Sequence, residues 1–431
     1  MKSLNILKSA TLFGLMAVST VAMAQQPQMQ YYRTPGIQGL NVFETPKDNT
    51  VPFTGMKVRV GGDFALQFQA LNHSTNPGDT LVNLGSNFNL PTANLNIDVQ
   101  LADGVRMNLV TYLSSRHHPE AWVKGGYIQM DKLDFISDGF LSGFMDIATI
   151  KIGLDEINYG DAHFRRSDNA RAIYNPFVGN YIMDAFTTEA FGEVNLQYNG
   201  LLGVVGLSNG NLNQSVNVGD ADPAPSIYFK LGYDKQMNDD LRVRLTGSFL
   251  NSPSYDNGRY LYNGDRTGAR YYWVMVEQGT GANGRDEDNF RSGRFSPNFR
   301  KFTSIQVNPF IKYKGIEFFG IYEMVNGDQA DADGARGGSY TQIAAELIYR
   351  FGSKEQFYVG GRYNTVAGNA NENAEDINIA RYNFGVGWFM LDNVMIKAEY
   401  MNQDYSGDGF TGSVFEEGNF NGAVLEAVIG F

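Results

Sequence analysis

The chain has 431 residues and a formal net charge of −12, with 46 acidic and 34 basic side chains and no cysteine. The acidic balance argues against nucleic acid or an anionic membrane surface as a partner, and the lack of cysteine excludes disulfides, thiol chemistry and cysteine-bound zinc. Tyrosine, phenylalanine and glycine are abundant and proline is sparse, which is typical of many strands joined by turns.

The first 24 residues have the organisation of a secretory signal peptide. Two lysines precede an uncharged, mostly apolar stretch over 9–21, and the small-x-small motif Ala22-Met23-Ala24 follows. The apolar stretch is too short for a comfortable membrane span. We therefore expect residues 1–24 to be removed. They carry two lysines and no acid, so the net charge of −12 becomes −14 in the mature chain.

Residues 25–56 precede the first predicted strand and are expected to form a periplasmic or lumenal segment. This segment is far shorter than the folded plug domain of an active transporter. With Tyr31, Tyr32 and the stretch 35–43 it could serve as the hatch of a hydrocarbon channel. Such a channel would need an apolar lumen.

A two-residue alternation of apolar and polar side chains dominates the rest of the chain and predicts strands. Residues 270–277 could also be a strand, so a barrel of eighteen strands is the alternative. The sixteen strands predicted from the alternation are 57–70, 93–102, 105–113, 122–132, 148–155, 190–198, 201–208, 226–236, 241–250, 301–313, 316–325, 340–351, 356–365, 380–390, 394–404 and 420–431.

Connection lengths distinguish a membrane barrel from a soluble sandwich, which shows the same local alternation. With these strands every tight turn falls on one side and every long polar loop on the other, while the connection 133–147 is long for its side. Short turns opposite long loops are the asymmetry of outer-membrane barrels. The predicted fold class is therefore an all-β, transmembrane antiparallel β-barrel with short periplasmic turns and long extracellular loops.

The last predicted strand ends on an outward-facing aromatic residue, Phe431. This ending resembles the C-terminal signal that the barrel assembly machinery reads in bacterial outer-membrane proteins. With the strand count and the loop asymmetry, the whole mature chain resembles the sixteen-stranded general bacterial porins. The resemblance implies an outer-membrane homotrimer in contact with outer-membrane lipid and lipopolysaccharide.

A second, weaker resemblance is to the phosphate-selective porins, whose constriction carries arginines. In porins of this architecture the loop after the fifth strand folds into the barrel, and here that loop is about 156–189. The candidate constriction residues are His163, Arg165, Arg166, Asp168 and Arg171. The rival interpretation is that Asp161, Asp168 and Asp184 neutralise these arginines within the loop.

Inward-facing charges of both signs nearly balance along the predicted strands, so they either brace one another across strands or act on solutes. The basic ones gather near the periplasmic ends, while the surface loops are acidic. An anion that has passed the constriction would meet rising positive potential. The predicted basic collar comprises Lys57, Arg59, Arg106, Arg242, Arg244, Lys312, Arg350 and Lys397.

The loop 251–300 interleaves arginines with tyrosines and a tryptophan. Such a loop can bind sugars or phosphates through stacking and bidentate hydrogen bonds. It can equally be a self-packed loop that covers the mouth.

No nucleophile or metal motif is present among the four histidines, so we expect no enzyme activity, cofactor or metal. The expected function is a passive diffusion channel for small hydrophilic solutes with a weak preference for anions. The alternatives are a substrate-specific channel for phosphate, oligosaccharides or hydrophobic compounds, and a non-conducting barrel that serves as a scaffold for a surface complex.

Overall fold

The computed structural model describes residues 26–76, 80–89, 91–112, 122–165, 171–213, 215–263, 270–279, 292–329 and 336–431. The predicted signal peptide and two of the predicted constriction residues, Arg166 and Asp168, lie outside these ranges.

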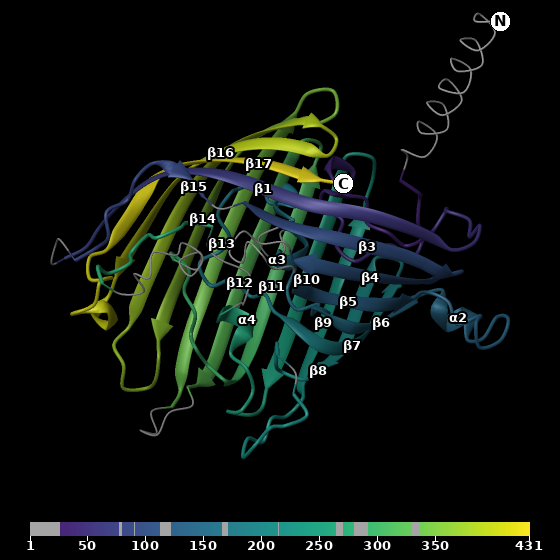
Figure 1. Ribbon diagram of the computed structural model, residues 1–431, viewed down its shortest axis with the longest axis horizontal. Helices are drawn as coiled ribbons and strands as arrows, with labels where there is room; N and C mark the ends of the chain where they lie inside the picture. The colour runs from purple at the N-terminus through teal and green to yellow at the C-terminus, as the bar shows by residue number, and fades with distance from the viewer. Residues whose placement is uncertain are drawn as a thin grey trace, which may run out of the picture.

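Sixteen antiparallel strands close into a barrel, because the last strand, β17, pairs with the first, β1, over the whole register from Asp63–Gly430 to Ser74–Asn419 (Figure 1). A two-residue strand, β2 (Asn87–Phe88), pairs only with β1 and does not contribute to the wall. The barrel strands are β1 (Lys57–Ser74), β3 (Thr92–Ala102), β4 (Val105–Tyr112), β5 (Trp122–Met130), β6 (Ala148–Glu156), β7 (Thr188–Tyr198), β8 (Leu201–Ser208), β9 (Ser226–Gln236), β10 (Leu241–Ser252), β11 (Lys301–Tyr313), β12 (Ile316–Asp328), β13 (Gly338–Phe351), β14 (Phe357–Asn369), β15 (Ile377–Leu391), β16 (Val394–Ser406) and β17 (Asn419–Gly430).

The helices among the described residues are single turns within connections. None of them is long and apolar enough to cross a membrane. They are η1 (Ile37–Gly39), α2 (Ser142–Met145), α3 (Ala162–Arg165), η3 (Ala172–Tyr174), α4 (Tyr260–Asn263) and η5 (Asp408–Phe410).

All sixteen predicted strands are confirmed, with ends that differ by up to four residues. The largest differences lie at the loop end, where β1 continues to Ser74 and β14 to Asn369. Both faces of these strand tips are polar, so the alternation that marks a strand fades there. The additional strand over 270–277 does not form, and Glu277 makes only an isolated bridge with Leu81.

The two ends of the barrel differ, as predicted. The turn end carries the short connections, such as the Asn199-Gly200 hairpin, whose φ angles of 51° and 88° suit a type I′ turn. The connection between β5 and β6 also lies at the turn end but is longer and contains α2. The loop end carries the long connections, including those after β6 and β10.

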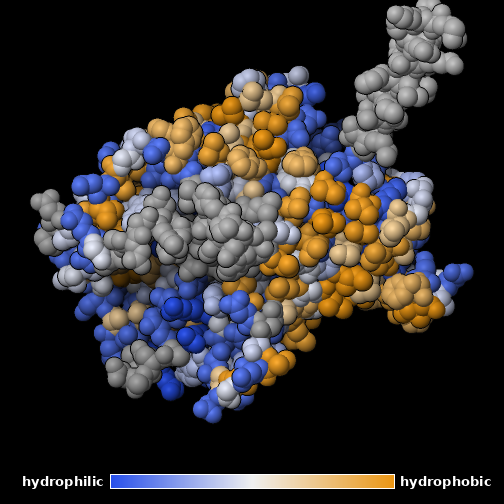
Figure 2. All heavy atoms as spheres, viewed as in Figure 1, coloured by the Kyte–Doolittle hydropathy of each residue, from blue (hydrophilic) through white to orange (hydrophobic). Residues whose placement is uncertain are grey.

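The outer surface of the barrel is an apolar belt. Outward side chains such as Leu231 and Leu347 are exposed, and Figure 2 shows the apolar wall over β3 to β6. At the turn end, Tyr349, Phe351, Phe357 and Trp388 stack in succession across β13 to β15, with ring centroids 5.8, 5.6 and 5.9 Å apart. An apolar belt edged by aromatic side chains is the surface that a lipid bilayer requires of a barrel.

The final residue seals the seam between β1 and β17. The backbone N–H of Phe431 donates to the carbonyl of Gly62, and the Gly62 N–H donates to the carbonyl of Phe431, both at 3.0 Å. The ring lies outward over Gly62, where an added Cβ would approach it to 3.1 Å. Its role as an assembly signal stays a prediction.

Candidate pore and constriction

The inward side chains of the wall are polar and pair with one another. Arg350 donates to Glu317 (2.9 Å) on the neighbouring strand β12, and Arg242 donates to Asp234 (2.7 Å) on the neighbouring strand β9. Pairing lowers the cost of holding charges inside a protein. The bracing interpretation of the inward charges therefore describes much of this wall.

The connection between β6 and β7 runs inside the barrel and is buried along nearly its whole described length. We call residues 157–187 the inserted loop. Its first part is anchored to β9 and β10 through Asp161, which is fully buried. The Asp161 carboxylate accepts hydrogen bonds from Arg244 Nε (2.8 Å), Lys230 Nζ (3.0 Å) and Thr246 Oγ1 (2.7 Å).

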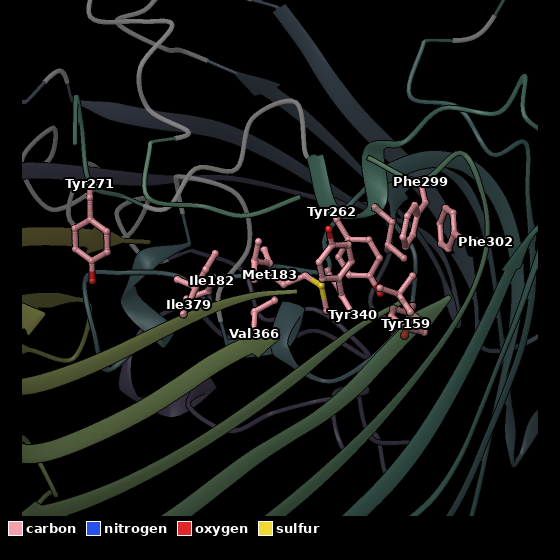
Figure 3. Packing of buried hydrophobic residues seen from close by; sticks show 14 of the residues in the cluster. Tyr159, Ile182, Met183, Tyr262, Tyr271, Phe299, Phe302, Tyr340, Val366 and Ile379 are labelled. Atoms are coloured by element: carbon pink, nitrogen blue, oxygen red, sulfur yellow. The ribbon is translucent and has the colours of Figure 1, made fainter. Parts of the chain in front are cut away.

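The second part of the inserted loop is anchored to β13, β14 and β16. Here backbone N–H groups of the loop donate to side chains of the wall, which satisfies donors that would otherwise be buried without partners. Apolar contacts accompany them: Figure 3 shows Ile182 and Met183 beside Val366 and Ile379 of the wall. The hydrogen bonds join Val178 and Gly179 to Glu399 (2.9 and 3.2 Å), Ile182 to Asn364 (2.7 Å) and Met183 to Gln342 (3.0 Å).

The segment before β1 crosses the barrel at the turn end. Gln30 donates to Asp103 (2.9 Å) beside β3, whereas Asn41 donates to Glu317 (2.7 Å) on β12. Between these positions, Arg33 donates to the carbonyl of Phe164 in the inserted loop (2.8 Å). The segment therefore contacts both the wall and the inserted loop.

A third segment packs inside the barrel toward the loop end, where residues 270–275 follow α4. Gln67 donates to the carbonyl of Arg270 (2.7 Å), and Gln69 exchanges hydrogen bonds with the backbone of Tyr272 (2.8 Å each). The Arg270 guanidinium pairs with Glu426 of β17. This part of the arginine-rich loop is packed inward, and a ligand-binding role for the loop stays a prediction.

One cavity of about 170 Å³ remains between the inserted loop and the wall formed by β1 and β3 to β7. No residue of β8 to β16 lines it, because the inserted loop covers that half of the barrel interior. Its charged lining comprises Arg33, Arg106, Lys151 and Arg171 together with Glu44, Asp63, Asp98, Asp155, Glu156 and Glu193.

Most charges around the cavity are paired across short distances. Arg106 lies 3.8 Å from Asp98, Lys151 lies 3.3 Å from Asp155, and the partly exposed Arg171 lies 3.5 Å from Glu156. In the part of the chain that the structure describes, Arg33 and Arg59 form no ion pair with a carboxylate. Arg33 instead stacks on Tyr174, 3.7 Å from the ring centroid, and Arg59 lies 5.3 Å from the ring centroid of Tyr32.

His163 contributes a titratable group to this cavity. Its ring Nδ1 lies 3.6 Å from Glu156, and the side chain is buried. Burial lowers the pKa of His163 because it disfavours the charged imidazolium, although the nearby Glu156 carboxylate acts in the opposite direction. The imidazole is therefore neutral at pH 7.

The structure separates the predicted constriction residues. His163 and Arg171 line the cavity. Arg165 is only 4% exposed and turns toward β13, where it donates to Glu346 at 2.9 Å. Of the loop carboxylates, Asp161 binds wall cations rather than loop arginines.

The predicted basic collar lies on the inner wall, and most of its charge is compensated. Lys312 lies 3.4 Å from Glu317, and Lys57 donates to the carbonyl of Gln28 (3.2 Å). Arg59 lies over the ring of Tyr32, 5.3 Å from its centroid. The remaining collar pairs are Arg106 with Asp98, Arg242 with Asp234, Arg244 with Asp161, Arg350 with Glu317, and Lys397 with Glu426.

Sequence reasoning missed Arg33, Tyr32 and Tyr174 as cavity residues. They lie in irregular segments without strand alternation, so no periodic signal indicates which way these side chains point. The tyrosine pair at 31–32 and the stretch 35–43 were the hints in that region.

No family model matches the chain, and no curated protein matches its sequence. Among solved structures, an anion-selective porin from Comamonas acidovorans superposes with a TM-score of 0.51 at 10% identity, covering 87% of this chain and 100% of that one. The outer membrane protein OmpT of Vibrio cholerae gives 0.49 at 10% identity over 88% and 99% of the two chains. The outer membrane channel DcaP of Acinetobacter baumannii gives 0.48 at 11% identity over 88% and 99%.

At these identities the likeness shows the fold alone, and of the three structures the first superposes with a TM-score above 0.5. That structure and this chain share a closed sixteen-stranded barrel. Together with the apolar belt and its aromatic edge, the fold makes this chain a β-barrel of the bacterial outer membrane.

Proposed function

We propose that the chain is a porin-like channel through which small hydrophilic solutes diffuse passively across the outer membrane. The observation that carries this proposal is the polar cavity between the inserted loop and the wall of β1 and β3 to β7. A hydrocarbon channel would need an apolar passage, whereas charged and amide side chains dominate this lining. A pure scaffold would have no need of a polar cavity within its barrel.

We further propose that the turn end faces the periplasm, as in other outer-membrane barrels. Residues 1–24 then act as the export signal, the barrel assembly machinery recognises the strand ending in Phe431, and the mature barrels associate as trimers in contact with lipopolysaccharide. Small outward residues such as Gly247 and Ala398 support close packing of barrels.

The constriction that we propose differs in part from the one expected from the sequence. It comprises His163 and Arg171 on the inserted loop, facing Arg106 and Lys151 on the wall. A cavity of this size holds several water molecules, so it suits small solutes that keep part of their hydration.

A weak preference for anions is part of the proposal. It rests on Arg33 and Arg59, the two cations near the turn end whose contacts in the described chain are carbonyls and aromatic rings. Two lining carboxylates act against it: Asp63 accepts from Asn96 (2.9 Å), and Glu193 accepts from Tyr228 (2.9 Å). Because these effects oppose each other, the preference is small.

The test is single-channel recording in planar bilayers under a salt gradient. We expect discrete conductance steps. We also expect a reversal potential that is displaced slightly from zero toward the equilibrium potential of the anion. Arg33→Gln should move the reversal potential toward the equilibrium potential of the cation, because it removes an uncompensated positive charge from the cavity wall. The control is Lys314→Gln in an exposed turn, which should leave the reversal potential unchanged.

Each alternative has its own outcome in the same recordings. No conductance would contradict the channel and favour the scaffold. A cation preference in the unmodified protein would contradict the anion proposal while leaving the channel intact. Block of the steps by phosphate or an oligosaccharide would instead indicate a substrate-specific channel.

A further inference from the structure

The long connection at the turn end is the feature that the channel function does not explain. Residues 131–147 join β5 to β6, where the other turn-end connections are much shorter, and they contain α2. We call residues 131–147 the β5–β6 insertion. Figure 1 shows α2 beside the ends of β5 and β6, projecting from the barrel.

The β5–β6 insertion packs on the outside of the barrel. Leu133 and Met145 are buried in a small cluster with Ala148, the first residue of β6. The other members of the cluster are outward-facing side chains of three neighbouring strands: Met130, Ile150, Val194 and Leu196. These are lipid-facing positions, so the insertion covers part of the membrane-facing wall at the turn end.

The side of the insertion that faces away from this cluster is apolar and exposed. Its large side chains are between 38% and 61% exposed, and Figure 2 shows apolar atoms gathered at the projection. The side chains of this face are Phe135, Ile136, Phe140, Leu141 and Phe144. An exposed group of large apolar residues usually marks a contact with a membrane or another protein.

The position of the insertion along the barrel indicates that its apolar face contacts lipid. Leu196, which it covers, lies two residues from the exposed Tyr198 at the end of β7. The outward positions at this end of β5 and β6 are Met130, Ala148 and Ile150, none of which is aromatic. The three phenylalanines of the insertion therefore lie at the turn end of β5 and β6. The stacked aromatic side chains of β13 to β15 occupy the same level on another part of the wall.

We propose that the β5–β6 insertion is an interfacial anchor, whose apolar face lies in the lipid leaflet at the turn end, at the level of the headgroups. The charges of the insertion favour one kind of lipid. Besides Asp131, which is buried and pairs with Lys47, the insertion carries three acids, Asp134, Asp138 and Asp146, against one base, Lys132. Anionic lipid would be repelled, so the anchor suits a zwitterionic leaflet and binds through its apolar area. The proposal rests on the membrane barrel and is independent of whether the barrel conducts.

Because the chain has no cysteine, single cysteines can report the surroundings of the insertion directly. The variants Ile136→Cys, Phe140→Cys and Phe144→Cys would each carry an environment-sensitive fluorophore, in the full-length mature protein reconstituted in phosphatidylcholine vesicles. Leu231→Cys on the apolar belt is the lipid control, and Asp239→Cys in the β9–β10 turn is the water control. Asp138→Cys, within the insertion but polar, is the matched control.

We expect spin-labelled lipid to quench the labels at 136, 140 and 144 at least twofold more than the labels at 138 and 239, and iodide to show the opposite order. Adding anionic lipid should not increase the lipid quenching. Quenching by iodide to the level of the label at 239 would overturn the anchor. Shielding from both quenchers, with energy transfer between labelled copies, would overturn it in favour of an interface between barrels. Three independent label sites keep the test valid if one variant fails to fold.

Discussion

At the scale of single residues, nearly every described inward charge forms an ion pair with an opposite charge or contacts backbone carbonyls. Lys397 shows both, because its ammonium pairs with Glu426 and also donates to the carbonyls of Ala172, Asn175 and Phe177 at 2.8 to 3.0 Å. Such contacts use a wall side chain to order a loop. They also leave few charges free to act on a solute, which is why a strong ion preference is not expected.

His163 gives this interior a pH dependence with a definite sign. Burial lowers its pKa in the folded chain below the ordinary value of about 6.5. As the pH falls through that value, the unfolded chain binds a proton that the folded chain does not, so the free energy of unfolding decreases. His163→Gln should remove this contribution.

The measurement is denaturant unfolding in vesicles at pH 7.5 and pH 5.5, followed by tryptophan fluorescence. We expect the unmodified protein to lose more stability between the two pH values than His163→Gln does. Equal losses in the two proteins would mean that folding does not lower the pKa of His163.

At the scale of elements, the strands could be predicted, whereas the side-chain contacts of the segments inside the barrel could not. The alternation over 394–404 reports directly that one face meets lipid and the other meets polar surroundings. The inserted loop has no such period, since its orientation is set by wall residues far away in sequence, such as Glu399 for Val178. This explains why Arg165, grouped with Arg171 by proximity in sequence, turns to the opposite wall.

The anchoring of the inserted loop can be tested at Asp161, which faces two buried cations. Asp161→Asn would remove one of the two carboxylates that Lys230 and Arg244 share, the other being Glu44, and breaking a buried ion pair costs about 3 to 5 kcal/mol. Unfolding in vesicles should show a loss of that order. The control is Asp240→Asn, whose exposed partner Lys314 lies 3.7 Å away and whose loss should cost less than about 1 kcal/mol. A loss at Asp161 no larger than at Asp240 would mean that the loop is held by its other contacts.

At the scale of the whole molecule, the barrel interior is divided. The inserted loop fills the side of β9 to β16, and the cavity lies along β1 and β3 to β7. The short turns, the insertion and the segment before β1 gather at one end, while the longest loops gather at the other. Among the described residues, the space that the proposed channel would use therefore lies along the wall of β1 and β3 to β7.

This division predicts which inward positions a water-soluble reagent can reach. Asn195→Cys on β7 lies in the cavity, whereas Ser304→Cys on β11 lies behind Tyr159 of the inserted loop and Tyr262 of α4. Both native side chains are small and buried, and the chain offers no competing thiol. In bilayer recordings, a charged methanethiosulfonate reagent should modify the thiol at 195 at least tenfold faster than the one at 304, and it should reduce the conductance only at 195. Equal rates would mean that the inserted loop leaves the wall of β11 open, because a thiol under a packed loop must wait for the loop to detach before it can react.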